Sequence, residues 1–390
     1  MTNQVFFDLR SGPFMQLFMD YPNSDFSISA VLAFFGHHIK DEDVLESFRK
    51  APRERLRSWR FKLIMPFAML HMLFVNQWKI PTVKKMIFEE NFADITVLMK
   101  KYPLKEKLEF ICDFVVSKYI VMEVHGPASF ASMIKTMILR GVLKKVEKNA
   151  DDLDSDMNLI LSHCNDVVSA EVPNMLRNIA QAVQNKESLA KLTDDEAVAL
   201  LKNPSSSEPI ASKMFLEFLS KHGHRCYREL DPMYPTWNED PTPCIQVIKS
   251  MFSQSNTTKQ KENLSVDQVL SQLKAPLTGF RRLMVKYWLL PWVRNAVGHR
   301  ENTKSALIKF QEGVKIAFRQ LSHEMVQAGI LPEADLFYYL KLSEIATLTS
   351  GDRNSVLVMK AKQRRRLYPK LNSLKYPEFV KGFRMAPKVS

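Results

Sequence analysis

The sequence predicts an all-α protein, a single large helical domain with proline-rich turns and little or no sheet. Among its 390 residues only 11 are glycine, whereas 20 are methionine and 25 are phenylalanine. This composition is typical of packed helices and argues against a β-sandwich or a glycine-rich nucleotide fold. Apolar residues also recur at three- and four-residue steps, which is the period of a helix. With 46% hydrophobic residues, the chain can form a substantial buried core.

The N-terminal region combines aromatic clusters with turn formers. We expect residues 1–50 to form short helices or extended pieces, and no chemistry stands out there. The most apolar window, Phe61 to Trp78, is interrupted by Lys62, Pro66 and further polar residues. These interruptions favour a buried core helix over a membrane span.

Prolines and capping residues mark the ends of the helices that follow. Breaks are expected at Pro81, Pro103 and Gly126-Pro127. The acidic run of residues 151–156 lacks the glycine and distal Glu of a calcium loop and is interpreted as a helix N-terminal cap. Two capping boxes are predicted, Thr193 with Glu196 and Ser265 with Gln268.

Residues 130–146 carry one apolar stripe at helical spacing. The stripe consists of Met133, Ile134, Met137, Ile138, Val142 and Val146. It predicts a buried face, with Lys135, Lys144, Lys145 and Lys148 on the opposite side.

A polar turn interrupts the helical pattern within residues 215–241. An amphipathic helix from Phe215 breaks at Gly223, and a cluster of charged residues follows, with prolines after it. Loops held by helices carry convergent polar groups, so the turn is interpreted as ligand-facing; the alternative is a connector with satisfied side chains. We expect His224 and Arg225 to hydrogen-bond Glu229 or Asp231, with Trp237 packed beneath. Asp240-Pro241 would start the next helix.

Metal binding is not expected at this turn. His222, His224 and Cys226 alternate and would share a face on an extended strand, but the sequence supplies no evident fourth ligand.

A long helix is predicted to end at Gly329, after an aromatic run over residues 277–297 that is broken or kinked at Pro291. On an ideal wheel, Arg300 and Lys304 lie within about 40° of the apolar stripe of this helix. Because an unpaired buried charge costs several kcal/mol, both cations must pair with an acid or face a polar cavity. An internal ion pair with Glu229 or another acid, and contact with a ligand, remain alternatives.

The sequence contains four groups of motifs in a characteristic order. These are S-A-E-V-P at residues 169–173, G-H-R, E-L-D and W-x-x-D-P within residues 223–241, R-E-x-x-K at residues 300–304, and Y-P-E with K-G at residues 376–382. Together they resemble the central substrate-binding domain of the rifampicin phosphotransferase and phosphoenolpyruvate synthase-like (PEP-utilising) family. The resemblance covers residues 1–385, more closely over 166–385 than over 1–165, and leaves 386–390 as a tail. The bacterial pattern is expected to have glycine at Cys226 and Arg228.

The resemblance implies a site for a small organic acceptor that a longer relative would phosphorylate. Its substrate-binding residues would be Arg300, Lys304, His224, Arg225 and Glu229. Full-length relatives use ATP and Mg, with an ATP-grasp domain and a phosphohistidine domain that this chain would lack or would meet in a split form. The sequence has no phosphate loop and no nucleophile elbow, so we predict no catalytic residue and no cofactor in this chain. Whether the chain is an enzyme stays open, and alone it is not expected to be catalytically competent.

The positive charge gathers at the C-terminal end. The net charge is +13, and residues 351–390 hold eleven Lys or Arg against two acids, a net of +9. A run such as residues 362–366 suggests an alternative function, a non-catalytic helical interaction module that docks acidic partners. The simpler interpretation of this run is a solvated helix face. No nucleic-acid motif and no secretory signal is evident. Four widely spaced cysteines suggest a reduced, cytoplasmic setting, and we expect no membrane association.

Overall fold

The computed structural model describes residue 67 and residues 78–89, 94–117, 120–147, 149–162, 168–252, 265–351 and 355–374. Predictions for residues 1–50, for most of the window from residue 61 to 78, and for residues 376–382 lie outside these ranges.

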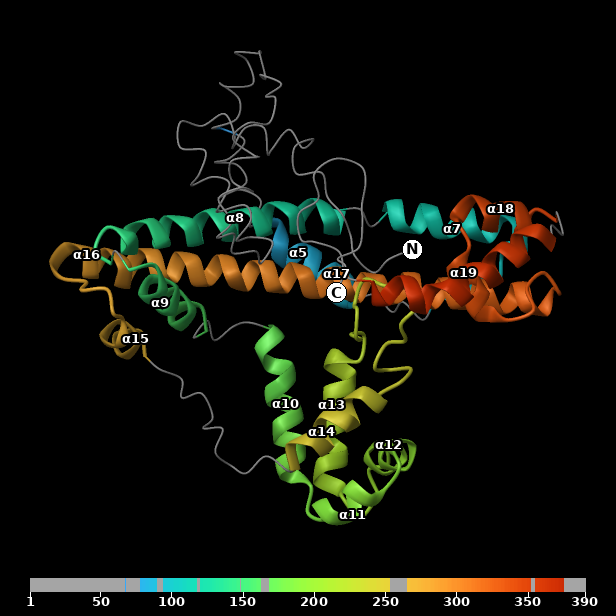
Figure 1. Ribbon diagram of the computed structural model, residues 1–390, viewed down its shortest axis with the longest axis horizontal. Helices are drawn as coiled ribbons and strands as arrows, with labels where there is room; N and C mark the ends of the chain where they lie inside the picture. Colours follow the sequence, from blue (N-terminus) through green and yellow to red (C-terminus); the bar gives the residue numbers. More distant parts are fainter. Residues whose placement is uncertain are drawn as a thin grey trace. The chain divides into compact units, whose positions relative to one another are not determined.

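Every regular element in the described ranges is helical. They contain 15 α-helices, α5 to α19, with a π-helical turn η3 and a 3₁₀-helix η4, and no strand (Figure 1). The predicted all-α fold is confirmed. None of the helices in these ranges combines the length and the apolar character that crossing a membrane would require.

The chain divides into two compact units. One takes in Met72–Gln327, and the other takes in Met1–His71 with Ala328–Ser390. Each is described by itself, and the single boundary at residues 1–385 stays a prediction.

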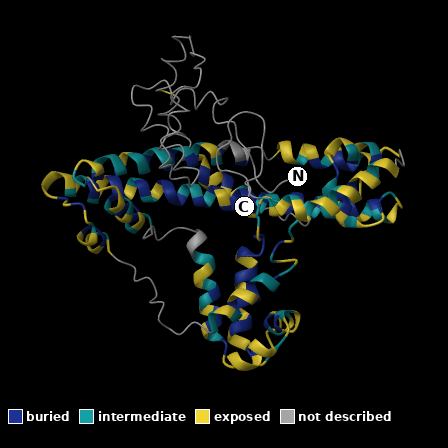
Figure 2. Ribbon diagram, in the orientation of Figure 1, coloured by how far each residue is buried: buried dark blue, intermediate teal, exposed yellow. Residues whose placement is uncertain are grey.

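The unit of residues 72–327 contains most of the helices. They are α5 (Lys79–Glu89), α6 (Asp94–Met99), α7 (Leu104–Ser117), α8 (Ile120–Lys144), α9 (Ala150–Ser162), α10 (Val168–Ala182), α11 (Lys186–Lys191), α12 (Asp194–Lys202), α13 (Pro209–His222), α14 (Thr242–Phe252), α15 (Val266–Gln272), α16 (Gly279–Met284), η3 (Val285–Leu289) and α17 (Leu290–Gln327). The 38-residue α17 lies alongside α8 (Figure 1), and Figure 2 shows buried residues along both helices.

Three hydrophobic clusters are formed by the described residues of this unit. The first joins the C-terminal half of α8 to α9, α15, η3 and the start of α17, through residues such as Leu139 and Val293. The second cluster packs the five helices α10 through α14 together and includes Phe215 and Phe218. The third packs α5 and the N-terminal half of α8 on the middle of α17, with Phe310 among its members. Helix α17 therefore contributes to two of the three clusters.

Local sequence signals are confirmed at several helix ends. Both capping boxes form, at Thr193 and at Ser265. Acidic residues lie in the first turn of α9, as expected for a helix N-terminal cap. Helix α17 ends at Gln327, just before Gly329, whose φ of 67° is the left-handed conformation typical of C-caps.

One predicted break is wrong, since helix α8 runs through Gly126-Pro127 without stopping. The break predicted at Pro291 is confirmed to within one residue. Helix α17 begins at Leu290, directly after the π-helical turn η3, and has Pro291 in its first turn, where a proline N–H is not needed.

The predicted orientation of α8 is confirmed at Lys144 and Lys145, which are exposed, but it is wrong at two other positions. Lys135 was expected on the solvent side but is only 1% exposed, whereas Ile138 of the apolar stripe is 41% exposed. The face that packs inward carries Ala131, Ser132, Lys135 and Leu139. Since two faces of α8 carry apolar residues, the local pattern alone does not decide which one packs inward.

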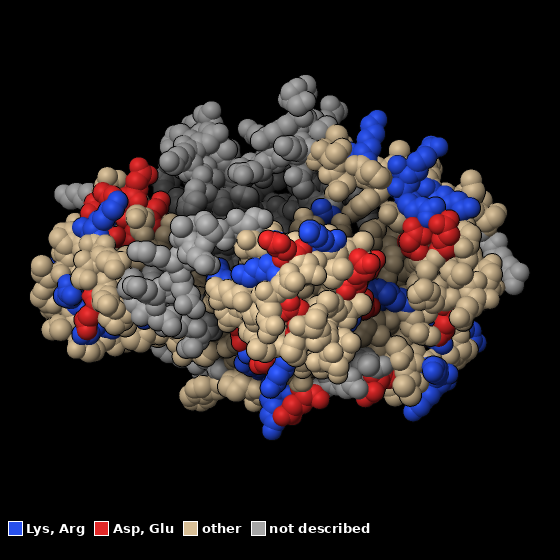
Figure 3. Space-filling view, turned by 90° about the horizontal axis from the view of Figure 1, so that it is seen from below, with Lys and Arg blue, Asp and Glu red and all other residues tan. Residues whose placement is uncertain are grey.

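The other unit contains η4 (Ala334–Tyr339), α18 (Leu342–Thr349) and α19 (Ser355–Ser373). Two cations of the basic run are engaged within it. Arg364 forms a two-nitrogen pair with Glu344, and Arg365 pairs with Glu333 and Asp335. On the face shown in Figure 3, acidic and basic side chains of the described residues lie interspersed.

Candidate functional site

Residues 223–241 form an irregular segment between α13 and α14 that we name the polar loop. Its two arms are hydrogen-bonded to each other, Trp237 N to Arg225 O at 2.8 Å and Asn238 N to Gly223 O at 2.8 Å. The ring of Trp237 stacks on Phe218 of α13, with centroids 5.7 Å apart, which anchors the loop to the second hydrophobic cluster. The predicted start of the next helix is confirmed, since Asp240 Oδ1 accepts from Thr242 N at 3.1 Å.

Helix α17 anchors the polar loop from the other side. Lys315, which is 2% exposed, donates to the Tyr234 carbonyl at 3.1 Å and to Cys226 Sγ at 2.8 Å. Arg319 donates to the same carbonyl at 3.2 Å and pairs with Glu239.

A further anchor joins Asn238 Nδ2 to Glu312 Oε1 at 3.1 Å. The sequence analysis missed these anchors. The available signal was the recurrence of charges at residues 312, 315 and 319, a charged stripe at helical spacing.

Backbone constraints shape the polar loop at two positions. A Cβ at Gly223 would lie 1.9 Å from Asn238 Oδ1 and 2.3 Å from Leu219 O, so only glycine fits without a shift. Arg228 has a φ of 58°, the left-handed region that favours glycine, at one of the positions where the family pattern is expected to have it. The Arg228 side chain compensates locally, because it donates to Tyr234 Oη at 3.0 Å and lies over the Tyr234 ring.

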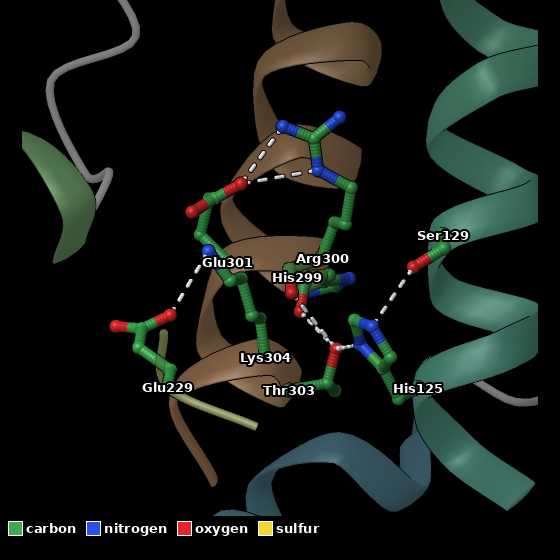
Figure 4. Close-up of polar contacts among 8 residues, drawn as sticks. All are labelled: His125, Ser129, Glu229, His299, Arg300, Glu301, Thr303 and Lys304. Carbon is green, nitrogen blue, oxygen red and sulfur yellow. Dashed lines mark hydrogen bonds and ion pairs between the residues drawn. The ribbon is translucent and has the colours of Figure 1, made fainter. Parts of the chain in front are cut away.

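Glu229 brings three of the predicted site residues together. Its Oε1 accepts from Arg225 at 3.2 Å, as predicted, and its Oε2 lies 3.4 Å from Lys304 Nζ of α17 (Figure 4). The ion pair that was the alternative to ligand contact for Lys304 is therefore present. It joins the polar loop to α17 near the middle of the helix.

Arg300 lies one turn before Lys304 and pairs with a different acid. Its Nε and Nη2 both donate to Glu301 Oε1, at 3.1 and 2.8 Å (Figure 4). The Arg300 side chain is 40% exposed and that of Lys304 is 46% exposed. Since α17 begins at Leu290, neither cation stands at a helix N-terminus.

A second polar contact lies beside these cations, between α8 and α17. His125 Nδ1 is 3.0 Å from Thr303 Oγ1, and Ser129 Oγ is 3.5 Å from His125 Nε2 (Figure 4). Burial lowers the pKa of His125, and the positive charge of Arg300 lowers it further.

His224 does not make the predicted bond to Glu229 or Asp231 in the described part of the chain. Its ring lies edge-on to Phe88 of α5, with centroids 5.8 Å apart, and the residue is 4% exposed. Burial, with the charges of Lys309 and Arg225, lowers the pKa of His224 to about 3. His224 is therefore neutral at pH 7 and packs as an interior ring. Across the described ranges, no group of three or more His, Cys, Asp or Glu side chains is placed to hold a metal ion.

The polar loop lies within a stretch of sequence that is similar to known proteins. Residues 125–301 match the family model described as the rifampicin phosphotransferase fourth domain. Rifampicin phosphotransferase of Streptomyces sviceus is 29% identical over 215 residues, which are 51% of this chain and 24% of the relative. That of Bacillus subtilis strain 168 is 27% identical over 138 residues, or 33% of this chain and 16% of the relative.

Residues 125–301 of this chain are therefore similar to the fourth domain of rifampicin phosphotransferase. The chain aligns with at most 24% of the length of these relatives. The fourth-domain match begins within α8, contains the whole polar loop and ends at Glu301 in α17. It thus includes Arg300 but stops before Lys304.

Replacing Glu229 tests whether its carboxylate stabilises the polar loop. In Glu229→Gln, the buried Arg225 loses its partner, and we expect the free energy of unfolding to fall by about 2 kcal/mol. Urea denaturation measures this value. Glu217→Gln, at an exposed acid of α13, is the matched control. A Glu229→Gln variant as stable as Glu217→Gln would contradict the pairing.

The low pKa of His224 predicts acid sensitivity. Between pH 6.5 and about 3, the unfolded chain binds a proton at His224 that the folded chain does not, so stability falls as the pH falls through this window. From pH 7 to pH 5, His224 should account for a loss of about 2 kcal/mol.

Denaturation at both pH values is to be compared for wild type and His224→Phe, with His323→Phe, at an exposed histidine of α17, as control. The loss should shrink in His224→Phe but not vanish, because burial also lowers the pKa of His222. An unchanged loss would exclude His224 as its source.

Proposed function

We propose that Arg300, Lys304 and the polar loop bind the small organic acceptor of a phosphotransfer reaction. The relatives' name, rifampicin phosphotransferase, states transfer of phosphate to an organic molecule. The fourth-domain match covers the polar loop and Arg300 and so supports a related role for this region. The proposal assigns acceptor binding to these residues and gives them no step of nucleotide chemistry.

The main support for this proposal is the bridge that Glu229 forms between Arg225 and Lys304. It holds a mobile lysine side chain at a fixed place beside the loop while leaving nearly half of that side chain exposed. An acceptor with a hydroxyl or anionic oxygen can meet the ammonium group there without displacing buried groups. Lysine supplies three donors, of which a single carboxylate oxygen needs only one.

Arg300 adds an oriented donor one turn away. Its Nε and Nη2 are engaged by Glu301, so the guanidinium plane is fixed, and no described residue engages Nη1. A fixed planar fork suits recognition of an oxygen atom, because little side-chain entropy is lost when a ligand binds. The two cations would thus position the acceptor oxygen.

His224 has a different role in this proposal. As a neutral interior ring against Phe88, it supports the base of the loop and does not contact the acceptor. Arg225 likewise positions Glu229. Direct contact is assigned to Arg300 and Lys304.

The interaction-module alternative, which rests on the positive charge of residues 351–390, stays a prediction. Within the described residues, Arg364 and Arg365 are already paired with acids, so fewer cations of the basic run are available to a partner.

Isothermal titration calorimetry tests the acceptor site. Rifampicin and a panel of phenols and carboxylic acids are titrated into wild type and into the double variant Arg300→Ala, Lys304→Ala. We expect the variant to lose at least about tenfold in affinity for any ligand that wild type binds, because hydrogen bonds to charged groups contribute about 1.5–3 kcal/mol.

The control is Arg281→Ala, Lys144→Ala, which removes two exposed cations of α16 and α8 and should bind as wild type does. Unfolding temperatures of both double variants establish that each is folded. Equal affinity in wild type and the Arg300→Ala, Lys304→Ala variant would refute the site.

A further inference from the structure

Polar side chains line the contact between α8 and α17 where an apolar core would be expected. Helix α8 contributes Ser129, Ser132 and Lys135, all buried. Helix α17 contributes His299 and Trp292. We name these five residues the polar seam.

Two contacts fix how the helices meet along the polar seam. At one end His125 is 3.0 Å from Thr303, and at the other Lys135 Nζ lies 4.8 Å from the centroid of the Trp292 ring. Residue numbers rise along α8 while they fall along α17, so the helices are antiparallel. The two serines of α8 and His299 of α17 therefore lie between these contacts.

The polar seam contains positive charge and no acid. Lys135 is 1% exposed, and none of the described acidic residues pairs with it. The Trp292 ring covers one side of the ammonium and compensates for part of the lost hydration. Burial lowers the pKa of Lys135 to about 8, so most of the lysine is still protonated at pH 7. An interior ammonium ion without an anionic partner destabilises the fold.

A second group in the polar seam also lacks a partner. His299 Nδ1 is buried and has no hydrogen-bond partner among the described residues. Burial lowers the pKa of His299, and the charge of Lys135 lowers it further. Buried polar groups are nearly always hydrogen-bonded, which makes the combination of these two groups unusual for a purely structural contact.

We propose that the polar seam binds an oxyanion, a phosphate or carboxylate group, between Lys135 and His299. An oxyanion would pair with the Lys135 ammonium and accept from His299 when its ring carries the proton on Nδ1. The serine hydroxyls of α8 are further donors for the remaining oxygens. The site contains neither Arg300 nor Lys304 and does not rest on the proposed acceptor function.

The oxyanion site and a purely structural role predict opposite effects of the same substitution. Methionine is close to lysine in length and apolar. If Lys135 is kept for ligand binding at the expense of stability, Lys135→Met should raise the unfolding temperature in the absence of oxyanions. If the contact of Lys135 with Trp292 is structural, the same change should lower it.

The binding test is a thermal shift measurement on the full chain. Wild type, Lys135→Met and Lys144→Met are melted in chloride, inorganic phosphate and acetate at one ionic strength and pH 7. Lys144 is the control because it is an exposed lysine of the same helix. We expect phosphate or acetate, at about ten times its Kd, to raise the unfolding temperature of wild type and Lys144→Met by about 2 °C. Whichever anion is effective identifies the class of ligand.

Lys135→Met should show no such rise and should melt above wild type in chloride. The proposal is overturned if neither anion shifts wild type, or if Lys135→Met shifts as much as wild type. Should Lys135→Met not fold, His299→Leu takes its place and should lose at least half of the rise. The Arg300→Ala, Lys304→Ala variant should retain the full rise, which separates this site from the acceptor site.

Discussion

The contact between Lys315 of α17 and the polar loop is the constraint on which the candidate site depends. A loop of 19 residues without regular structure carries backbone groups that need partners, and Tyr234 O finds two of them in Lys315 and Arg319. Lys304 and Lys315 lie three turns apart and about 20° apart in azimuth, so one face of α17 meets the loop at both places. Fixing Tyr234 at Lys315 therefore sets where Glu229 can meet Lys304.

Features that depend on neighbours in the sequence were predictable. The capping boxes at Thr193 and Ser265 involve residues three positions apart, and the pairing of Arg225 with Glu229 spans one turn of chain. Gly223 was predicted to end α13. The reason that this residue must be glycine was not predictable, because it is the close approach of Asn238 within the folded loop.

Features set by packing between distant segments were not predictable. The pattern in α8 favoured a buried Ile138 and a solvated Lys135, yet the helix turns the lysine face towards α17. The partners of Lys315 are more than 80 positions away in the sequence, and nothing local to α17 indicates them. The helix wheel did align Arg300 and Lys304 with the apolar stripe, but it did not reveal that both are partly exposed and paired with carboxylates.

The length of α17 allows one helix to serve two polar regions and two hydrophobic clusters. The N-terminal part packs on the C-terminal half of α8, the middle packs on α5, and the face turned to the polar loop carries the anchoring charges. The π-helical turn η3 lies directly before α17, and α17 continues unbroken from Leu290 through Arg300 and Lys304.

The most direct test of this account is amide hydrogen exchange of residues 223–241 in wild type, Lys315→Met and the exposed-site control Lys213→Met. Loss of the Lys315 anchors should speed exchange throughout the polar loop by at least about tenfold, since about 1.4 kcal/mol of local stability corresponds to that factor. Helices α10 to α13 should keep their protection, and Lys213→Met should exchange as wild type does. Unchanged exchange of the loop in Lys315→Met would contradict the account.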